Sequence, residues 1–392
     1  MTGGAGSGDA GSGGTGSGGT GSGGTGSGGT GSGGTGSGGT GSGDAVAGGA
    51  GSGDAGSSDP VTGGAGSRGA VKGDQGKCAP GSRGGGLLVI GDVVTDVVVR
   101  HATPPARGTD TAARIRTLPG GAGANVACWA ARWGCRDVRL LARVGTDSAA
   151  WHLDALRRAG VRAELVVDEE APTATVVALV GSDAERTFLT DSGAALRLSS
   201  ADWSPSLLDG IGHLHVSGYL FFAPASRAAA LLALREARHR GIPTSVDPAS
   251  AGFLAELGAD RFLAAVDGVG LLLPNADEAR LLTGLPEPAD AAAALSRRFP
   301  LVAVTLGVHG VLLAVSGAMS AHVTAEPVRA PVDSTGAGDA FTGGFLAARL
   351  AGAAAAEAAA AGCRSGAEAV AGVGARPPRH RAPSCSSPRP PE

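Results

Sequence analysis

The sequence predicts an α/β protein in which helices cover both faces of a doubly wound, mostly parallel sheet. Short apolar runs alternate with helix-like segments along about 290 residues, which is the pattern of such sheets. Polar residues also recur where these runs end, at Asp247, Asn275 and Thr305. Because the carboxyl ends of parallel strands form the ligand crevice, these positions indicate one binding site. Two glycine-rich turns, near Gly120 and Gly336, each lead into a helix-like run.

The chain divides into three parts by composition. Residues 1–85 consist mostly of Gly, Ser, Thr, Asp and Ala, and residues 11–40 repeat Gly-Ser-Gly-Gly-Thr. A segment with so little apolar surface cannot offset the entropy of ordering, so we expect a disordered low-complexity leader. An interaction tail and an over-extended start both remain open for it. Residues 86–376 are the expected folded domain, and residues 377–392, rich in Pro, Arg and Ser, are expected to be a disordered tail.

Charge and composition argue against several functional classes. The net charge is −3, aromatic residues make up 3%, and no basic stripe is visible, so we expect no nucleic-acid partner. The Ala-rich run at residues 351–363 is too short for a membrane span and carries Glu357, so we expect no membrane partner. The five cysteines are scattered and the N-terminus lacks a charged-then-apolar signal. Both observations favour reduced thiols in a cytoplasmic protein.

The first half of the domain begins with an apolar strand at residues 87–91. The β-branched run after it contains Asp96, which either accepts hydrogen bonds from substrate hydroxyls or faces solvent on an edge strand. Residues 97–118 and 162–191 contain short β-rich pieces and predict a small β lid. Between them, the Gly120-Gly121 turn enters a helix that ends at Gly134, and Asn125 either faces a sugar or caps this helix.

Further β-α alternation fills the rest of the domain. A strand at residues 138–145 precedes a helix at 148–160, and a strand at 213–218 precedes an amphipathic helix at 225–240 that Pro224 introduces. Strands ending in polar residues follow at 243–248, 270–275 and 301–305, and residues 311–315 pair back as a hairpin.

The last glycine turn suggests phosphate chemistry. Gly336, Ala337 and Gly338 allow a tight turn into the helix start, where N–H groups and the helix dipole attract anions. Asp339 follows at once and would lie beside that anion hole as a general base. The structural alternative is an acidic first-turn residue that stabilises the helix by roughly 0.3–1 kcal/mol.

Two motifs resemble those of the PfkB-type carbohydrate kinases, the ribokinase-like family. The C-terminal motif is Asp-Ser-Thr-Gly-Ala-Gly-Asp-Ala-Phe at residues 333–341, and the N-terminal motif is Gly-Gly-Ala-Gly-Ala-Asn-Val-Ala at residues 120–127. The resemblance spans residues 87–376 and implies a doubly wound sheet with a β lid. It also implies transfer of the γ-phosphoryl group of ATP to a hydroxyl of a sugar or related alcohol, with Mg²⁺.

The resemblance implies a role for each matching position. Asp339 would be the catalytic base, and the backbone of Gly336, Ala337 and Gly338 would form the anion hole. Substrate contacts would come from Asp96, Gly120, Gly121, Asn125 and the lid residue Arg186. The nucleotide side would include Asn275, Thr305, Gly307 and Gly310. Glu278 would organise Mg²⁺ through bound water, and Asp333 and Thr335 match positions near K⁺ in some relatives.

Three functions stay open after this comparison. A sugar kinase is preferred, with a homodimer through the lid as a candidate assembly. A nucleoside kinase of the same fold would need aromatic walls, for which Tyr219, Phe221 and Phe222 are candidates. A non-catalytic ATP- or sugar-binding regulator would need a damaged base or anion hole, and neither is seen. The particular sugar is undetermined, since Ala122 stands where some relatives carry a charged substrate contact.

Overall fold

The computed structural model describes residues 85–181 and 186–378. The expected leader, apart from Gly85, lies outside the described residues. The expected tail also lies outside them, apart from Pro377 and Pro378.

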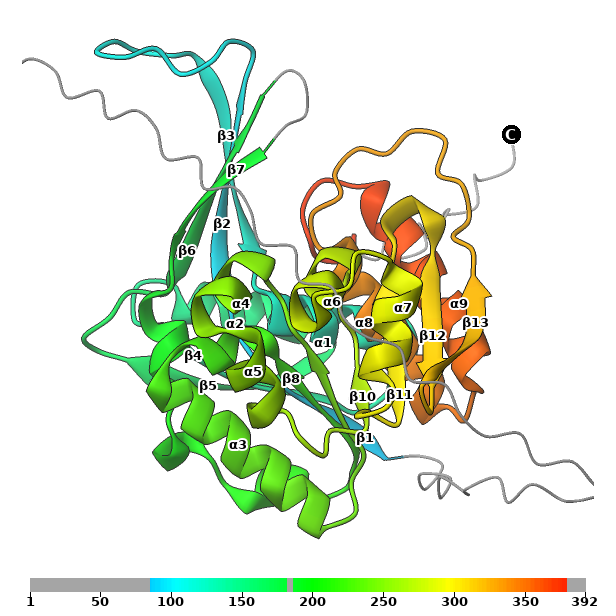
Figure 1. Ribbon diagram of the computed structural model, residues 1–392. Helices are drawn as coiled ribbons and strands as arrows, with labels where there is room; N and C mark the ends of the chain where they lie inside the picture. Colours follow the sequence, from blue (N-terminus) through cyan, green and yellow to red (C-terminus); the bar gives the residue numbers. More distant parts are fainter. Residues whose placement is uncertain (1–84, 182–185, 379–392) are drawn as a thin grey trace, which may run out of the picture. The chain divides into compact units, whose positions relative to one another are not determined.

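The body of the molecule is a nine-stranded sheet, which confirms the predicted fold class (Figure 1). The strands run in the spatial order β13-β12-β11-β10-β9-β8-β1-β4-β5. All neighbours from β5 to β11 are parallel, and β12 and β13 continue the sheet antiparallel, as the predicted hairpin requires. The strands of this sheet are β1 (Gly86–Ile90), β4 (Val138–Gly145), β5 (Val161–Asp168), β8 (Ile211–Ser217), β9 (Thr244–Asp247), β10 (Leu271–Leu272), β11 (Leu301–Thr305), β12 (Val311–Val315) and β13 (Ala318–Val323).

Helices cover both faces of this sheet, and the interior strand β1 explains why. Leu88 and Ile90 pack into one apolar core, while Leu87 and Val89 pack into the other. A strand that is apolar on both faces must be covered on both sides. The first core contains residues of α3 (Pro224–His239), α4 (Ala251–Leu257), α5 (Ala259–Ala265), α6 (Ala276–Thr283) and α7 (Pro288–Leu295). The second contains residues of α1 (Ala122–Arg132), α2 (Ala149–Arg158), α8 (Ala337–Leu350) and α9 (Ala355–Val370).

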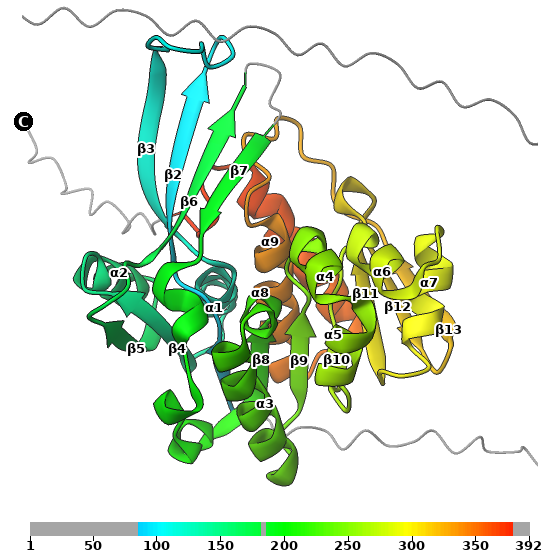
Figure 2. The same ribbon diagram turned by 60° about the vertical axis from the view of Figure 1, so that its left-hand side comes forward.

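A second sheet of four strands forms the lid and rises from the α/β body in both ribbon views (Figure 2). Its strands, in spatial order, are β3 (Ala113–Gly120), β2 (Val94–His101), β6 (Ala174–Val180) and β7 (Arg186–Asp191). The expected second lid segment, residues 162–191, begins too early. Residues 161–168 form β5, which pairs in parallel with β4 at the edge of the large sheet, so the lid resumes only at Ala174.

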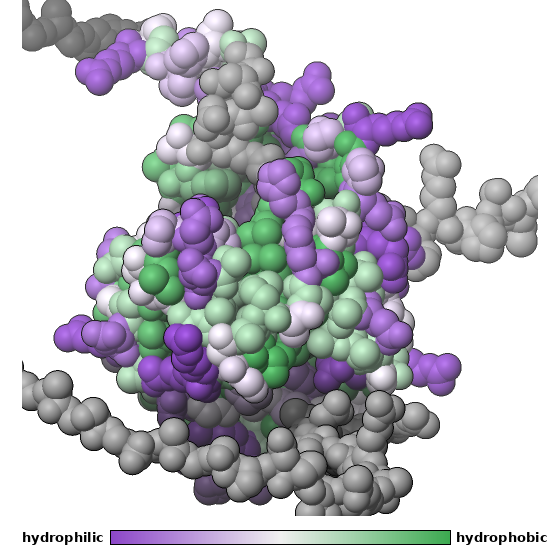
Figure 3. Space-filling model, turned by 45° about the vertical axis from the view of Figure 1, so that its right-hand side comes forward, coloured by the Kyte–Doolittle hydropathy of each residue, from purple (hydrophilic) through white to green (hydrophobic). Residues whose placement is uncertain are grey.

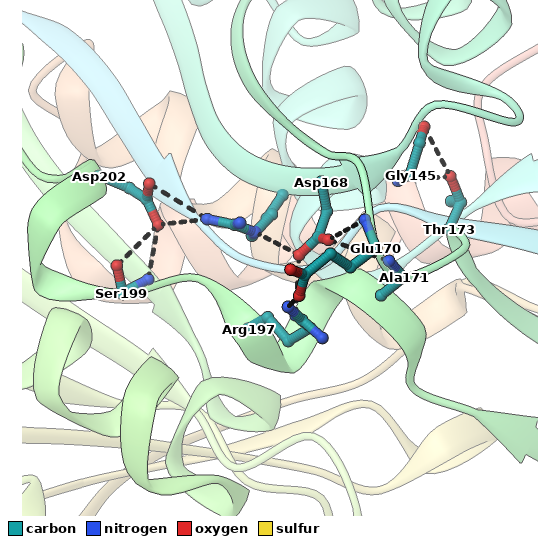
Figure 4. Close-up of polar contacts among 9 residues, drawn as sticks. Gly145, Asp168, Glu170, Ala171, Thr173, Arg197, Ser199 and Asp202 are labelled. Carbon is teal, nitrogen blue, oxygen red and sulfur yellow. Dashed lines mark hydrogen bonds and ion pairs between the residues drawn. The ribbon is translucent and has the colours of Figure 1, made fainter.

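The passage from β5 to the lid is fixed by an arginine that bridges two carboxylates (Figure 4). Arg143 of β4 donates from Nε to Asp168 Oδ2 at 2.8 Å and from Nη1 to Asp202 Oδ2 at 3.1 Å. Asp168 ends β5 and also accepts the backbone N–H groups of Glu170 and Ala171 at 2.9 Å. Although partial desolvation opposes it, these donors lower the pKa of Asp168 to about 2.

The buried histidines and the distribution of apolar side chains are those of a packed domain. His213 and His215 are buried and share the Ser245 hydroxyl at 2.8 and 2.9 Å, as expected for core residues. Among the described residues, none of the helices combines the length and apolar character that a membrane span requires. On the face shown in Figure 3, hydrophilic side chains surround a central area of apolar ones and are interspersed with them.

Candidate active site

The C-terminal glycine turn starts α8 at the mouth of a cleft. Gly336 has φ 73°, a left-handed conformation that favours glycine, and a Cβ there would lie 2.5 Å from the Ala375 side chain. Gly336 is the N-cap of α8, so Ala337, Gly338 and Asp339 form its first turn. A Cβ at Gly338 would meet no heavy atom within 4 Å, because this position faces the open cleft. A ligand can therefore approach the first N–H groups of α8 closely.

The N-terminal glycine turn starts α1 in a similar way. Gly121 has φ 95°, and a Cβ there would lie 2.6 Å from the Asp92 carbonyl oxygen. The Asp92 carboxylate accepts the N–H groups of Ala122 at 2.8 Å and Gly123 at 3.2 Å, and the Ser217 hydroxyl at 2.9 Å. Sequence reasoning assigned no role to Asp92. Its position directly after the first apolar strand is the same signal that drew attention to Asp247.

The two helix starts meet across the cleft. A Cβ at Gly343 of α8 would lie 2.7 Å from the Trp129 Cβ of α1, so this glycine lets the two helices pack closely. Asn125 Nδ2 then donates to Asp339 Oδ2 at 2.8 Å, across 214 residues of sequence. The alternative that Asn125 caps its helix is wrong, because Gly121 is the N-cap. Asn125 Oδ1 is buried and has no hydrogen-bond partner among the described residues.

A cavity of about 520 Å³ opens between these turns, the lid and the carboxyl ends of the strands. Carboxylates dominate its polar lining: Asp92, Asp96, Asp191, Asp247, Glu278, Asp333 and Asp339. Burial raises the pKa of Asp339 to about 8, with Asp247, Asp92 and Asp96 adding to the rise and the Asn125 hydrogen bond opposing it. A carboxylate with such a pKa can accept a proton near neutral pH.

Asp96 reaches the cleft from lid strand β2. Gly120 permits this, because a Cβ there would lie 2.1 Å from Asp96 Oδ2. Burial raises the pKa of Asp96 to about 7, and the positive charge of Arg376 opposes the rise. The alternative of a solvent-facing edge position is wrong, because Asp96 lines the cavity and β2 lies between β3 and β6. Gly121 and Asn125 also line the cavity, whereas the side chain of Arg186 lies outside the described part of the structure.

The opposite end of the cleft could hold a hydrated cation. Asn275 and Glu278 form a reciprocal helix cap, in which Asn275 Oδ1 accepts the Glu278 N–H and Glu278 Oε2 accepts the Asn275 N–H, both at 2.9 Å. Burial and the nearby Asp247 raise the pKa of Glu278. Within the described ranges, no group of three or more His, Cys, Asp or Glu side chains could hold a metal. The two carboxylates of Glu278 and Asp247 nevertheless fit Mg²⁺, because this ion keeps several waters and takes further oxygens from phosphates.

Three residues predicted for the nucleotide side lie outside the cavity lining. Thr305 forms an isolated parallel bridge with Asn275, and Gly307 and Gly310 have φ 58° and 89° in the following turn. Among the described residues that line the cavity, Thr305, Gly307 and Gly310 do not appear. Asp333 and Thr335 do line it, and Thr335 donates to Asp333 Oδ1 from both N and Oγ1, at 3.0 and 2.7 Å.

Aromatic rings form part of the cleft wall. Tyr219, Phe253 and the lid residue Phe188 line the cavity. Phe222 stacks on Phe253 with ring centroids 5.1 Å apart, so it supports the wall from behind. Of the three aromatic candidates that sequence reasoning named, Phe221 is buried in the core instead. Phe188 and Phe253 gave no local sequence signal, since only the fold brings them to the cleft.

Known proteins share both the sequence pattern and this architecture. Residues 86–382 match the family model described as pfkB family carbohydrate kinase. A fructokinase from Klebsiella pneumoniae is 34% identical over 276 residues, which cover 67% of this chain and 84% of that protein. The adenosine kinase structure from Sinorhizobium meliloti has a TM-score of 0.68 at 23% identity, covering 75% of this chain and 96% of that one. A putative ribokinase II from E. coli in complex with ATP and Mg²⁺ has a TM-score of 0.65 at 24% identity, covering 74% and 94%.

Proposed function

Because this chain belongs to the pfkB family of carbohydrate kinases, we propose that it transfers the γ-phosphoryl group of ATP to a hydroxyl of a sugar. One observation carries the proposal: the 2.8 Å hydrogen bond between Asn125 and Asp339. It joins a polar residue beside one glycine turn to a half-buried carboxylate beside the other, at a single cleft. A sugar hydroxyl and a phosphate could therefore meet at Asp339.

In the proposed reaction, Asp339 takes the proton of the substrate hydroxyl. The hydroxyl oxygen then forms a bond to the γ-phosphorus, the bond from that phosphorus to the β–γ bridging oxygen breaks, and ADP leaves. The backbone at Gly336, Ala337 and Gly338 would donate to the transferring group, whose charge also suits the positive end of α8. Aligning the two reactants is itself a large part of such catalysis.

The other cleft residues would hold the two substrates. Asp96, the free Asn125 Oδ1 and the Gly120-Gly121 turn would bind sugar hydroxyls, with Arg186 contributing from the lid. Asn275, Thr305, Gly307 and Gly310 would form the nucleotide side. Glu278 and Asp247 would hold Mg²⁺, which neutralises phosphate charge when bound. We also propose K⁺ near Asp333 and Thr335, which comparing activity in K⁺ and in Na⁺ would test.

Replacing the base tests the assignment most directly. Asp339→Asn keeps the size and polarity of the side chain but cannot accept the proton, so kcat should fall by about 10²- to 10⁴-fold. ATP binding, measured by calorimetry, should stay within about twofold. The assay is ATP consumption across ribose, fructose, 2-keto-3-deoxygluconate, fructose phosphates and nucleosides. Full activity of the variant would refute the role of Asp339, and turnover of none of these by the wild type would refute the proposed function.

A nucleoside kinase is the second candidate, and the aromatic wall favours it. Tyr219, Phe253 and Phe188 offer ring faces on which a nucleobase could stack. Phe253→Leu should then weaken binding of adenosine and leave binding of free ribose unchanged. Efficient phosphorylation of adenosine or inosine alone in the panel would replace the sugar by a nucleoside as substrate.

We also propose a homodimer that pairs through the lid. Ile115 on β3 and Leu189 on β7 are 62% and 57% exposed, although both are large and apolar. Covering them would remove apolar surface from water. Light scattering on the purified chain, compared with an Ile115→Lys variant, tests this, and a monomeric wild type at micromolar concentration would contradict it.

A further inference from the structure

A half-buried arginine near the end of the described chain lies against the substrate-side turn. Arg376 Nη2 donates to the Gly120 carbonyl oxygen at 2.9 Å, across 256 residues of sequence. Its Nε and Nη1 atoms are also buried and have no hydrogen-bond partner among the described residues. Guanidinium nitrogens that are buried without a hydrogen-bond partner are rare, because removing the charge from water is costly.

The segment that carries Arg376 is tied to both glycine turns. The Gly374 N–H donates to Asp333 Oδ2 at 3.1 Å, beside the C-terminal turn. The Trp129 indole of α1 donates to the Ala375 carbonyl oxygen at 2.8 Å. With these two contacts on its preceding residues, Arg376 is held in a defined position beneath Gly120.

The charges around this position explain what the arginine can do. Asp96 faces Arg376, but it also faces the like charges of Asp92, Asp333 and Asp339. Arg376 is further faced by Cys128 and His152. Burial lowers the pKa of Arg376, and Cys128 and then Asp96 oppose that shift. A guanidinium stays charged even so, and it is the positive group that opposes the rise in the pKa of Asp96.

We propose that Arg376 is a positioning residue for the substrate side of the cleft. Its hydrogen bond fixes the carbonyl of Gly120, whose Cα lies directly against the Asp96 carboxylate, and its positive charge attracts that carboxylate when it is ionised. Asp96 is thereby held ready to accept hydrogen bonds from substrate hydroxyls. The proposal rests on the proposed function. The alternative is an arginine that only anchors the C-terminal segment, and the experiment separates the two.

The kinetic arm uses Arg376→Met, Arg376→Lys and the control Arg364→Met. Arg364 is exposed on α9 and lies over the Trp133 ring. Its replacement therefore also removes one positive charge, but from a position outside the cleft. With the sugar that the wild type phosphorylates, Arg376→Met should raise KM for the sugar about tenfold. This factor corresponds to the loss of a hydrogen bond that involves a charged group. KM for ATP should stay within about twofold. Arg376→Lys should recover most of the loss, and the control should resemble the wild type.

Equal increases in both KM values, or a loss confined to stability and kcat, would overturn the proposal. A merely structural arginine would give that result, since it has no preference for the sugar. If Arg376→Met does not fold, Arg376→Gln removes the charge while keeping a donor at the same position.

A second set of measurements follows unfolding and does not depend on kinase activity. Unfolding by urea is measured for wild type, Arg376→Met, Asp96→Asn and the double variant, at pH 8.5 and pH 5.5. At pH 8.5 the two substitutions should be non-additive by about fivefold or more in the unfolding equilibrium constant. At pH 5.5 Asp96 binds a proton and the coupling should disappear. Additive effects at both pH values would overturn the proposal, even if the wild type phosphorylates no sugar and the proposed function itself fails.

Discussion

Replacing Gly120 by alanine should disable the substrate side of the cleft while leaving the fold intact. The added Cβ would lie 2.1 Å from Asp96 Oδ2, whereas ordinary contacts begin near 3.4 Å. The carboxylate would therefore retreat by the difference, 1.3 Å. It is the free end of a side chain, so it can rotate away rather than force the backbone apart, and the overpacking penalty should be near the low end of about 1–3 kcal/mol.

The expected loss of function is much larger than the loss of stability. A displacement of about 1 Å in a binding group can cost about 10²-fold in rate, because the substrate is no longer aligned with the reacting groups. We therefore expect kcat/KM for the sugar to fall about 10²-fold in Gly120→Ala. A coupled assay of ADP release gives this value, and calorimetry with ATP should give an unchanged affinity.

The matched control is Gly252→Ala in α4. A Cβ there would meet only the Ser250 hydroxyl, at 3.8 Å, so this variant adds the same methyl group without a clash. Its kinetics should match the wild type. If Gly120→Ala also retains wild-type kcat/KM while folding normally, Asp96 does not bind the substrate and the reasoning fails.

Three further predictions concern ionisation. In Asn125→Ala, loss of the hydrogen bond that lowers the pKa of Asp339 should move the rise of kcat/KM to a pH above about 8, and an unchanged pH–rate profile would contradict this. Glu278→Gln keeps an oxygen for the helix cap, so titration of activity with Mg²⁺ should show only a roughly 10-fold higher half-saturating concentration; unaltered Mg²⁺ dependence would count against Glu278. The pKa of Asp168 lies near 2, so its carboxylate stabilises the fold above its unfolded pKa, and that contribution is lost as pH falls from about 4 towards 2. The urea-unfolding free energies of wild type and Asp168→Asn should accordingly differ at pH 7 and converge near pH 2, and a constant difference would refute this account.

The sequence was most informative where local chemistry decides the structure. Apolar runs ending in polar residues located the strands of the large sheet, and glycines at Gly120 and Gly336 located the two helix starts. These signals are local, because a strand needs apolar side chains and a tight turn needs glycine. The lid boundary failed because residues 161–168 have the β propensity of either sheet, and only pairing with β4 decides between them.

The residues that sequence reasoning missed depend on long-range contacts. Arg376 stands at the edge of a Pro- and Arg-rich stretch, where composition indicates a tail. Arg376 donates to Gly120, and the preceding Ala375 accepts from Trp129, and neither contact is visible in the neighbouring sequence. Phe253 likewise looks like an ordinary apolar position of a short helix. Only the fold shows that its ring lines the cleft.

The contact between Arg376 and Gly120 also sets when the site can form during synthesis. The two residues are separated by 256 positions, and at about 5–20 residues per second a ribosome needs about 13–51 s to add them. For most of that interval β2, β3 and α1 exist without the arginine that donates to Gly120. The nascent chain can therefore build much of its sheet early but cannot complete the substrate side of the cleft until Arg376 has emerged.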